Sequence, residues 1–139
     1  MPIFFLAKSG FFLLMISFLS CNNNCAKEHT FSQLFIKSLK TIKENFEEPT
    51  SNVSELELRN SFFFLSKITG HPSSRIAGHF GVIYHKKEDY QNDVKTWEEW
   101  YDLNKNNYTI EDANKIFGQL PSNVKNGSRN WCDFFDQNK

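Results

Sequence analysis

The strongest constraint on the fold is a run of apolar side chains at helical spacing that begins directly after Thr30. Because an α-helix has 3.6 residues per turn, this spacing places the run on one face. The stripe consists of Phe31, Leu34, Phe35, Leu39, Ile42 and Phe46. Thr30 and Gln33 have the spacing of a capping box, and Pro49 ends the pattern because the residue before a proline disfavours helical backbone. The sequence therefore predicts an amphipathic helix between Thr30 and Pro49.

A second helix is predicted in "SNVSELELRNSFFFLSKITG", residues 51–70. Asn52 and Glu55 have capping-box spacing, and Gly70 suits the left-handed position that ends helices. The segment "FFFL" places apolar side chains almost all round, so we expect this helix to be the central and most buried one. The alternative is a strand through "FFFLS".

The rest of the chain continues the helical pattern after one interruption. Residues 71–86 contain Pro72 and two glycines, which predicts a loop with a short extended piece at 82–84. A third helix follows from Glu88, with apolar side chains at i, i+4, i+7 and i+11: Tyr90, Val94, Trp97 and Tyr101. A fourth is predicted from Thr109, with Asp112 completing a capping box, to near Gly118. The apolar patch "NWCDFFD" is expected to dock on the core. The fold class predicted for residues 30–139 is a single small all-α domain of about four helices.

Composition bears on both the core and the partners. Aromatic residues make up 16% of the chain, and because each buries a large area, few of them fill a small helical core. Lysine and arginine number 16, and aspartate and glutamate also number 16. This balance provides no electrostatic footprint for DNA or RNA, so nucleic acid is excluded as a partner.

The chain begins with an apolar leader that ends in a cysteine. After a lone Lys8 comes the nine-residue run "FFLLMISFL", about half of the roughly 20 residues that a membrane-spanning helix needs. That length is typical of the apolar region of a signal peptide. The alternatives are an ordinary cleaved signal and an uncleaved anchor over residues 3–19, the latter disfavoured because Lys8 inside a short span is costly.

The sequence "FLSC", residues 18–21, resembles the lipobox of bacterial lipoproteins. The resemblance implies cleavage of a signal peptide of residues 1–20 after Ser20 and attachment of lipid to Cys21. Residues 21–29 would then be the lipidated cysteine and a polar tether. The attached acyl chains make the membrane a partner, because two or three of them hold a protein stably. Asn22, rather than aspartate, after the cysteine implies the outer membrane, facing the periplasm.

The two remaining cysteines are Cys25 and Cys132. If Cys21 carries lipid, these are the only two thiols left in an oxidising compartment, and the termini of a compact domain are often close together. We expect them to form a disulfide bond. The alternative is two free cysteines, with Cys132 buried and Cys25 exposed in the tether.

A second resemblance covers about 50 residues of the mature chain. An Ile-Thr-Gly ending one helix and a Trp-x-x-Trp-Tyr-x-x-Asn pattern on the next are similar to uncharacterised helical proteins of the bacterial envelope. The positions are Ile68, Thr69, Gly70, Trp97, Trp100, Tyr101 and Asn104. The resemblance implies a mode of helix packing and no catalytic residues. Trp97, Trp100 and Tyr101 form a candidate interaction surface, because exposed aromatic residues are typical of binding sites. Their helical spacing favours the alternative, in which Trp97 and Tyr101 are core and Trp100 lies at its edge.

Three histidines in the loop, His71, His79 and His85, are candidate metal ligands. No pair has the i, i+4 spacing that places two ligands on one helical face, so no metal site or cofactor is predicted. The expected function is a lipid-anchored, non-enzymatic helical domain that binds or supports another envelope protein. A narrower form is an immunity-type lipoprotein that neutralises a toxin. The alternative is a small periplasmic hydrolase or metal-binding enzyme that uses the His71–His85 loop.

Overall fold

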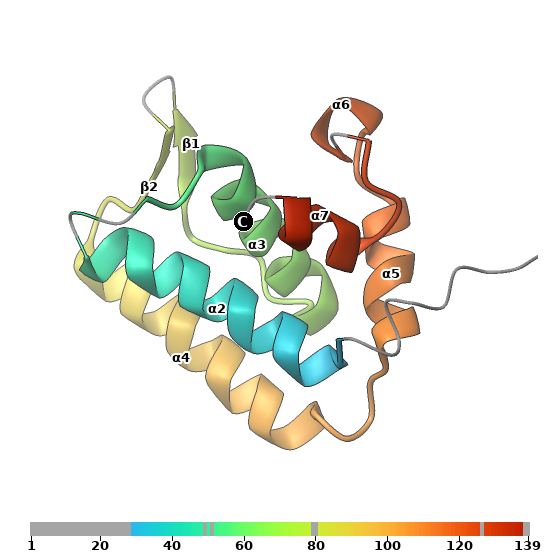
Figure 1. Cartoon of the computed structure of the whole chain (residues 1–139). Helices are drawn as coiled ribbons and strands as arrows, with labels where there is room; N and C mark the ends of the chain where they lie inside the picture. Colours follow the sequence, from blue (N-terminus) through green and yellow to red (C-terminus); the bar gives the residue numbers. More distant parts are fainter. Residues whose placement is uncertain (1–28, 49, 51, 79–80, 126, 138–139) are drawn as a thin grey trace, which may run out of the picture.

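The computed structural model describes residues 29–48, 50, 52–78, 81–125 and 127–137. Within these residues the chain folds as a small all-α domain with one short β-hairpin (Figure 1). The elements in chain order are α2 (Phe31–Glu47), α3 (Glu55–Thr69), β1 (Ile76–Gly78), β2 (Gly81–Ile83), α4 (Lys87–Asn104), α5 (Ile110–Gly118), α6 (Ser122–Lys125) and α7 (Trp131–Gln137). The four predicted helices correspond to α2, α3, α4 and α5.

The helix ends follow local side-chain chemistry. The capping boxes predicted at Thr30 and Thr109 are both present, and Gly70 ends α3 in the left-handed conformation at φ 70°. The box predicted at Asn52 is wrong. Ser54 is the N-cap of α3, and its hydroxyl accepts a hydrogen bond from the backbone N–H of Glu57 at 3.2 Å. The helix starts later than predicted because Ser54 satisfies a first-turn N–H that has no partner within the helix.

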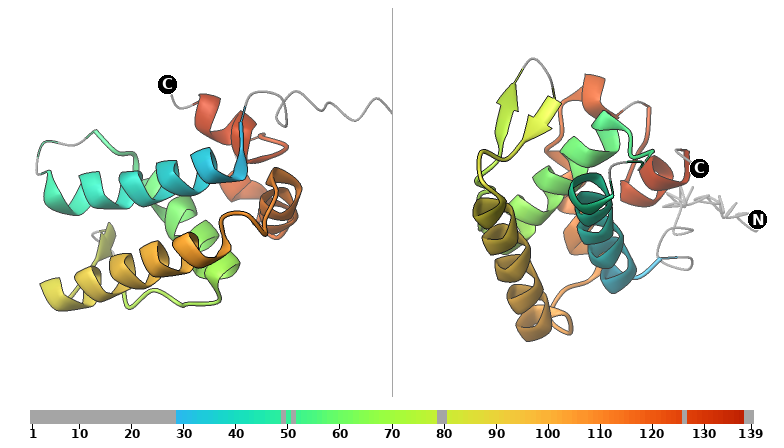
Figure 2. Two further views of the ribbon diagram at one scale, coloured as in Figure 1. Left: turned by 90° about the horizontal axis from the view of Figure 1, so that it is seen from below. Right: turned by 90° about the vertical axis from the view of Figure 1, so that its left-hand side faces the viewer.

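The helix α3 is the central element. It packs against α2, α4, α5 and β2, which confirms its predicted central position and excludes a strand through "FFFLS". The helices α2 and α4 run antiparallel along one side of the domain, as two views show (Figures 1 and 2). Their antiparallel arrangement brings the C-terminal end of α2 next to the N-terminal end of α4.

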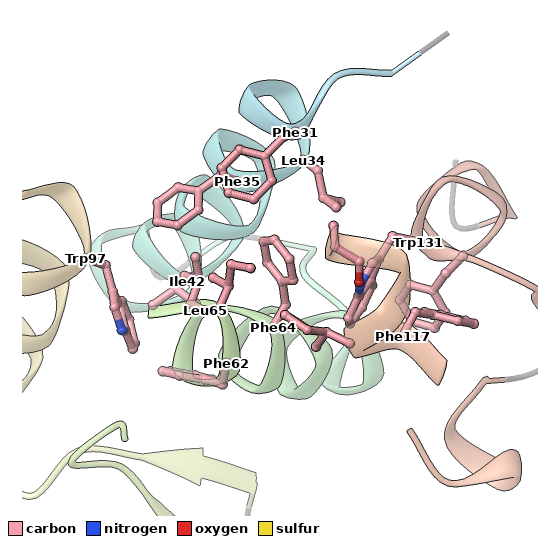
Figure 3. Close-up of a cluster of buried hydrophobic side chains, with 14 of the residues drawn as sticks. Phe31, Leu34, Phe35, Ile42, Phe62, Phe64, Leu65, Trp97, Phe117 and Trp131 are labelled. Carbon is pink, nitrogen blue, oxygen red and sulfur yellow. The ribbon is translucent and has the colours of Figure 1, made fainter. Parts of the chain in front are cut away.

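The core combines aromatic rings with aliphatic side chains such as Leu34, Ile42 and Leu65 (Figure 3). Phe64 of α3 lies between the rings of α2 and those of α7. Its ring centroid is 6.2 Å from that of Phe35 of α2 and 5.4 Å from that of Trp131 of α7. Trp131 is completely buried and its indole N–H donates to the carbonyl of Ala113 at 3.0 Å. The last apolar patch therefore docks on the core as predicted, in the form of helix α7.

The segment between α3 and α4 contains a β-hairpin that the sequence predicted only in part. The strands β1 and β2 pair antiparallel, with Ile76 opposite Ile83 and Gly78 opposite Gly81. The extended piece predicted at 82–84 overlaps β2, whereas its partner strand was not anticipated. Two strands of three residues each give little stability alone, so the hairpin depends on its packing against α3.

The predicted signal peptide, Cys21, Cys25 and most of the predicted tether lie outside the described residues. Cys132 is buried and disulfide-bonded. Its pairing with Cys25 stays a prediction, because Cys25 is not among the residues described. None of the helices within the described ranges is long and apolar enough to cross a membrane.

Candidate functional site: a saturated carboxylate beside an aromatic groove

The most densely bonded polar group in the described part of the chain is the Asp93 carboxylate on α4. It is only 1% exposed and lies under the loop that follows α3. The Oδ1 atom is 3.0 Å from Nε2 of His71 and accepts from the Ser74 hydroxyl at 3.1 Å. The Oδ2 atom accepts from the Ser74 backbone N–H at 2.7 Å and from the hydroxyls of Ser73 and Tyr84, each at 2.9 Å. Five donors therefore converge on one carboxylate.

The hydrogen bonds fix the ionisation state of Asp93. Burial alone would raise the pKa of this carboxyl, but the bonds from His71, the Ser74 backbone, Tyr84 and Ser73 outweigh it and hold the pKa below its usual value. Because an ionised carboxylate only accepts hydrogen bonds, Nε2 of His71 must carry its proton. Burial also raises the pKa of Tyr84, so its hydroxyl stays protonated and can donate.

This arrangement differs from a nucleophilic triad. In a triad the base takes a proton from the nucleophile, which requires a hydrogen bond between histidine and serine. Within the described residues neither Ser73 nor Ser74 is hydrogen-bonded to His71, and both hydroxyls donate directly to Asp93. The role that these hydrogen bonds support is structural, because they attach residues 71–74 and Tyr84 to α4.

A groove with a volume of about 560 Å³ lies beside this cluster. Three segments meet there: the C-terminal end of α2, the residues after β2 and the first turns of α4. The lining residues are Phe46, Glu47, Tyr84, Lys86, Lys87, Tyr90 and Gln91. Tyr84 belongs both to this groove and to the Asp93 cluster, so its hydrogen bond to Asp93 fixes one part of the groove lining.

The floor of the groove consists of three aromatic rings in mutual contact. The ring of Phe46 lies 5.0 Å from that of Tyr84 and 5.3 Å from that of Tyr90, and the two tyrosine rings lie 5.6 Å apart. The Tyr90 hydroxyl donates to Oε1 of Glu47 at 2.7 Å. Burial and this bond raise the pKa of Tyr90 well above its ordinary value. Both tyrosine hydroxyls therefore donate to carboxylates.

The structure separates the three aromatic residues of the candidate interaction surface. Trp97 is completely buried, with its ring 6.0 Å from Phe62 and 6.3 Å from His71, so its assignment to a surface is wrong. Its position on the apolar stripe of α4 directs it into the core. Trp100 and Tyr101 are half-buried and both stack on Phe35, with ring centroids 5.7 and 4.8 Å away.

The three candidate metal ligands do not come together in the described residues. The ring of His71 bonds to Asp93, His85 is exposed, and His79 lies outside the described residues. No group of three ligating side chains occurs within the described ranges.

Asp93 was missed by the sequence reasoning although a signal existed. It stands three residues after Tyr90 and one before Val94, at a position where the helical stripe faces the core. A charged residue on a buried face requires partners, and the hydroxyl-rich "HPSS" loop could supply them. The groove had no such signal, because its lining joins the end of α2 to residues 84–91, which follow more than thirty residues later.

Together the fold and the site define a small all-α domain with an aromatic groove, one lining residue of which, Tyr84, is hydrogen-bonded to a buried carboxylate. No protein-family model, curated protein or solved structure matches the chain.

Proposed function

We propose that this protein is a lipid-anchored, non-enzymatic helical domain that binds another protein of the cell envelope through the groove between α2 and α4. The observation that carries the proposal is the groove itself. Its floor combines the half-buried rings of Phe46 and Tyr84 with the buried ring of Tyr90, and hydrogen bonds to Asp93 and Glu47 hold the two tyrosines in place. Aromatic side chains in a preformed depression are typical of protein-binding sites.

The state of Asp93 supports binding in preference to hydrolysis. A general base needs a lone pair and a pKa near the working pH. The two oxygens of Asp93 already accept five hydrogen bonds and its pKa is lowered, so the carboxylate is a poor base at neutral pH. The polar cluster is therefore better suited to holding the groove in shape.

The lipid anchor is tested by the Cys21→Ser variant. In a bacterial host that processes lipoproteins, labelled palmitate is expected to enter the wild-type chain and to be absent from the variant, because serine lacks the thiol that is alkylated. The variant should also leave the membrane fraction. The matched control is Cys25→Ser, which keeps Cys21 and should label like the wild type. Equal labelling of the Cys21→Ser variant would contradict the anchor.

The binding function is tested by photocrosslinking in intact cells. A photoreactive phenylalanine at position 91, in place of Gln91 in the groove, should give a discrete adduct that mass spectrometry identifies as an envelope protein. The same residue at position 111, in place of the exposed Glu111 on α5, should not give this adduct. Absence of a protein adduct at position 91, or the same adduct at both positions, would overturn the proposed function.

A further inference from the structure

We propose that the groove recognises an acidic segment of its partner, in which an aspartate or glutamate lies next to an apolar side chain. The proposal rests on the proposed function, because it takes the ligand to be a protein. It assigns the carboxylate to Lys86 and Lys87 at the rim and the apolar side chain to the rings of Phe46, Tyr84 and Tyr90.

The first argument is the state of the two groove lysines. Ten lysines lie in the described ranges, and eight of them interact with another group of the chain. The eight are Lys37, Lys40, Lys43, Lys67, Lys95, Lys105, Lys115 and Lys125. The side chains of Lys86 and Lys87 have no hydrogen bond, ion pair or ring contact within those ranges. Among the described lysines, the two ammonium groups without a partner are therefore adjacent in sequence, and both residues line the groove.

The second argument is the charge balance of the groove. Glu47 is the one carboxylate among its lining residues, and it already accepts the hydrogen bond of Tyr90 at 2.7 Å. Two ammonium groups against one carboxylate leave a formal charge of +1. Glu88 and Asp89 follow on the same turn of α4 but are not among the lining residues. A ligand that brings negative charge would therefore complement the groove.

The third argument concerns the apolar part of the ligand. Both tyrosine hydroxyls already donate to carboxylates, Tyr84 to Asp93 and Tyr90 to Glu47, so neither has a proton left for a ligand. A sugar needs many donors and acceptors, and this floor offers mainly ring carbon. An apolar side chain needs none, and an aromatic floor gives it a large contact area. The groove therefore favours a peptide over an oligosaccharide.

The proposal is tested with a random hexapeptide library and the full-length protein in detergent. The wild-type protein should enrich peptides in which an acidic residue is adjacent to an aromatic or aliphatic one. A double variant, Lys86→Gln with Lys87→Gln, should bind the enriched peptides about tenfold more weakly, because each exposed ion pair contributes a modest factor. The matched control is Lys95→Gln with Lys115→Gln, which removes two exposed lysines outside the groove and should bind like the wild type. Added salt should weaken wild-type binding.

Three outcomes would overturn the proposal: no enrichment, enrichment of peptides without acidic residues, or equal binding by the double variant. A further measurement compares the binding of the wild type and the double variant to vesicles of phosphatidylglycerol. If the lysine pair governs binding to vesicles and no peptide is enriched, the ligand of the lysines is a lipid headgroup. Failure of the proposed function is a separate result, because a protein adduct at position 91 in cells does not depend on acidic residues in the partner. If an adduct forms at position 91 but the library enriches peptides without acidic residues, the proposed binding function stands and the proposed acidic segment is wrong.

Discussion

Replacing Trp97 with alanine is expected to lower the free energy of unfolding by about 3–5 kcal/mol, the usual cost of removing a fully buried tryptophan. The side chain is completely buried and its ring contacts Phe62 and His71, so the variant leaves a large cavity between α3 and α4. For a domain of this size each kcal/mol corresponds to several degrees in melting temperature. Thermal unfolding followed by circular dichroism should show a decrease of about 15 °C or more.

Two variants provide controls for this measurement. Trp100→Ala removes a tryptophan three residues away that is only half-buried, so a clearly smaller decrease is expected. Trp97→Phe should retain much of the stability, because the indole N–H of Trp97 is buried without a hydrogen-bond partner in the described part of the chain. Equal melting temperatures for Trp97→Ala and Trp100→Ala would contradict the assignment of Trp97 to the core.

The helices could be predicted because each is encoded locally. The stripe from Phe31 to Phe46 has the helical period, and the boxes at Thr30 and Thr109 mark where helices begin. The start of α3 was misplaced because two residues with side chains that can cap a helix, Asn52 and Ser54, stand close together. The sequence-based box was assigned to Asn52 and Glu55 although Ser54 and Glu57 have the same spacing, and in the structure the hydroxyl of Ser54 satisfies the first turn.

The groove could not be predicted, because it is not encoded locally. Phe46 follows from the stripe of α2, and Tyr90 from the stripe of α4, but nothing in either pattern shows that their rings meet 5.3 Å apart. That contact depends on the antiparallel placement of α2 and α4 around α3, which is a tertiary property (Figure 1). Periodicity did place Trp97 on the buried face and Trp100 at its edge, whereas Tyr101, which it placed in the core, is only half-buried.

The groove and the Asp93 cluster depend on each other through Tyr84. The Tyr84 ring forms part of the groove floor, while its hydroxyl donates to Asp93 together with groups from the loop after α3. Without this carboxylate, the loop and Tyr84 would lose their shared attachment to α4. The shape of the groove is therefore expected to be sensitive to one residue that does not line it.

The variant Asp93→Ala is expected to lower the free energy of unfolding by about 3–5 kcal/mol, as for other buried charges or partners left unpaired. Five donors would lose their acceptor, and three of them, on His71, Ser73 and Tyr84, are half-buried. Urea unfolding at pH 7 should show the decrease. As a control, Asp102→Ala removes an exposed carboxylate on the same helix and should change stability by less than about 1 kcal/mol.

The pH dependence gives a sharper test through the variant Asp93→Asn, which keeps the shape of the side chain and removes its charge. The pKa of Asp93 is lowered in the folded state, so between the folded and unfolded pKa values the folded chain binds fewer protons than the unfolded one. The resulting stabilisation is fully present above about pH 5 and is lost as the pH falls through the folded-state pKa. The difference in unfolding free energy between the wild type and Asp93→Asn should therefore shrink from pH 7 to pH 3. Because the other carboxylates are common to both proteins, their titration largely cancels in this difference. A difference that stayed constant over that range would show that the charge of Asp93 does not hold the loop and Tyr84 against α4.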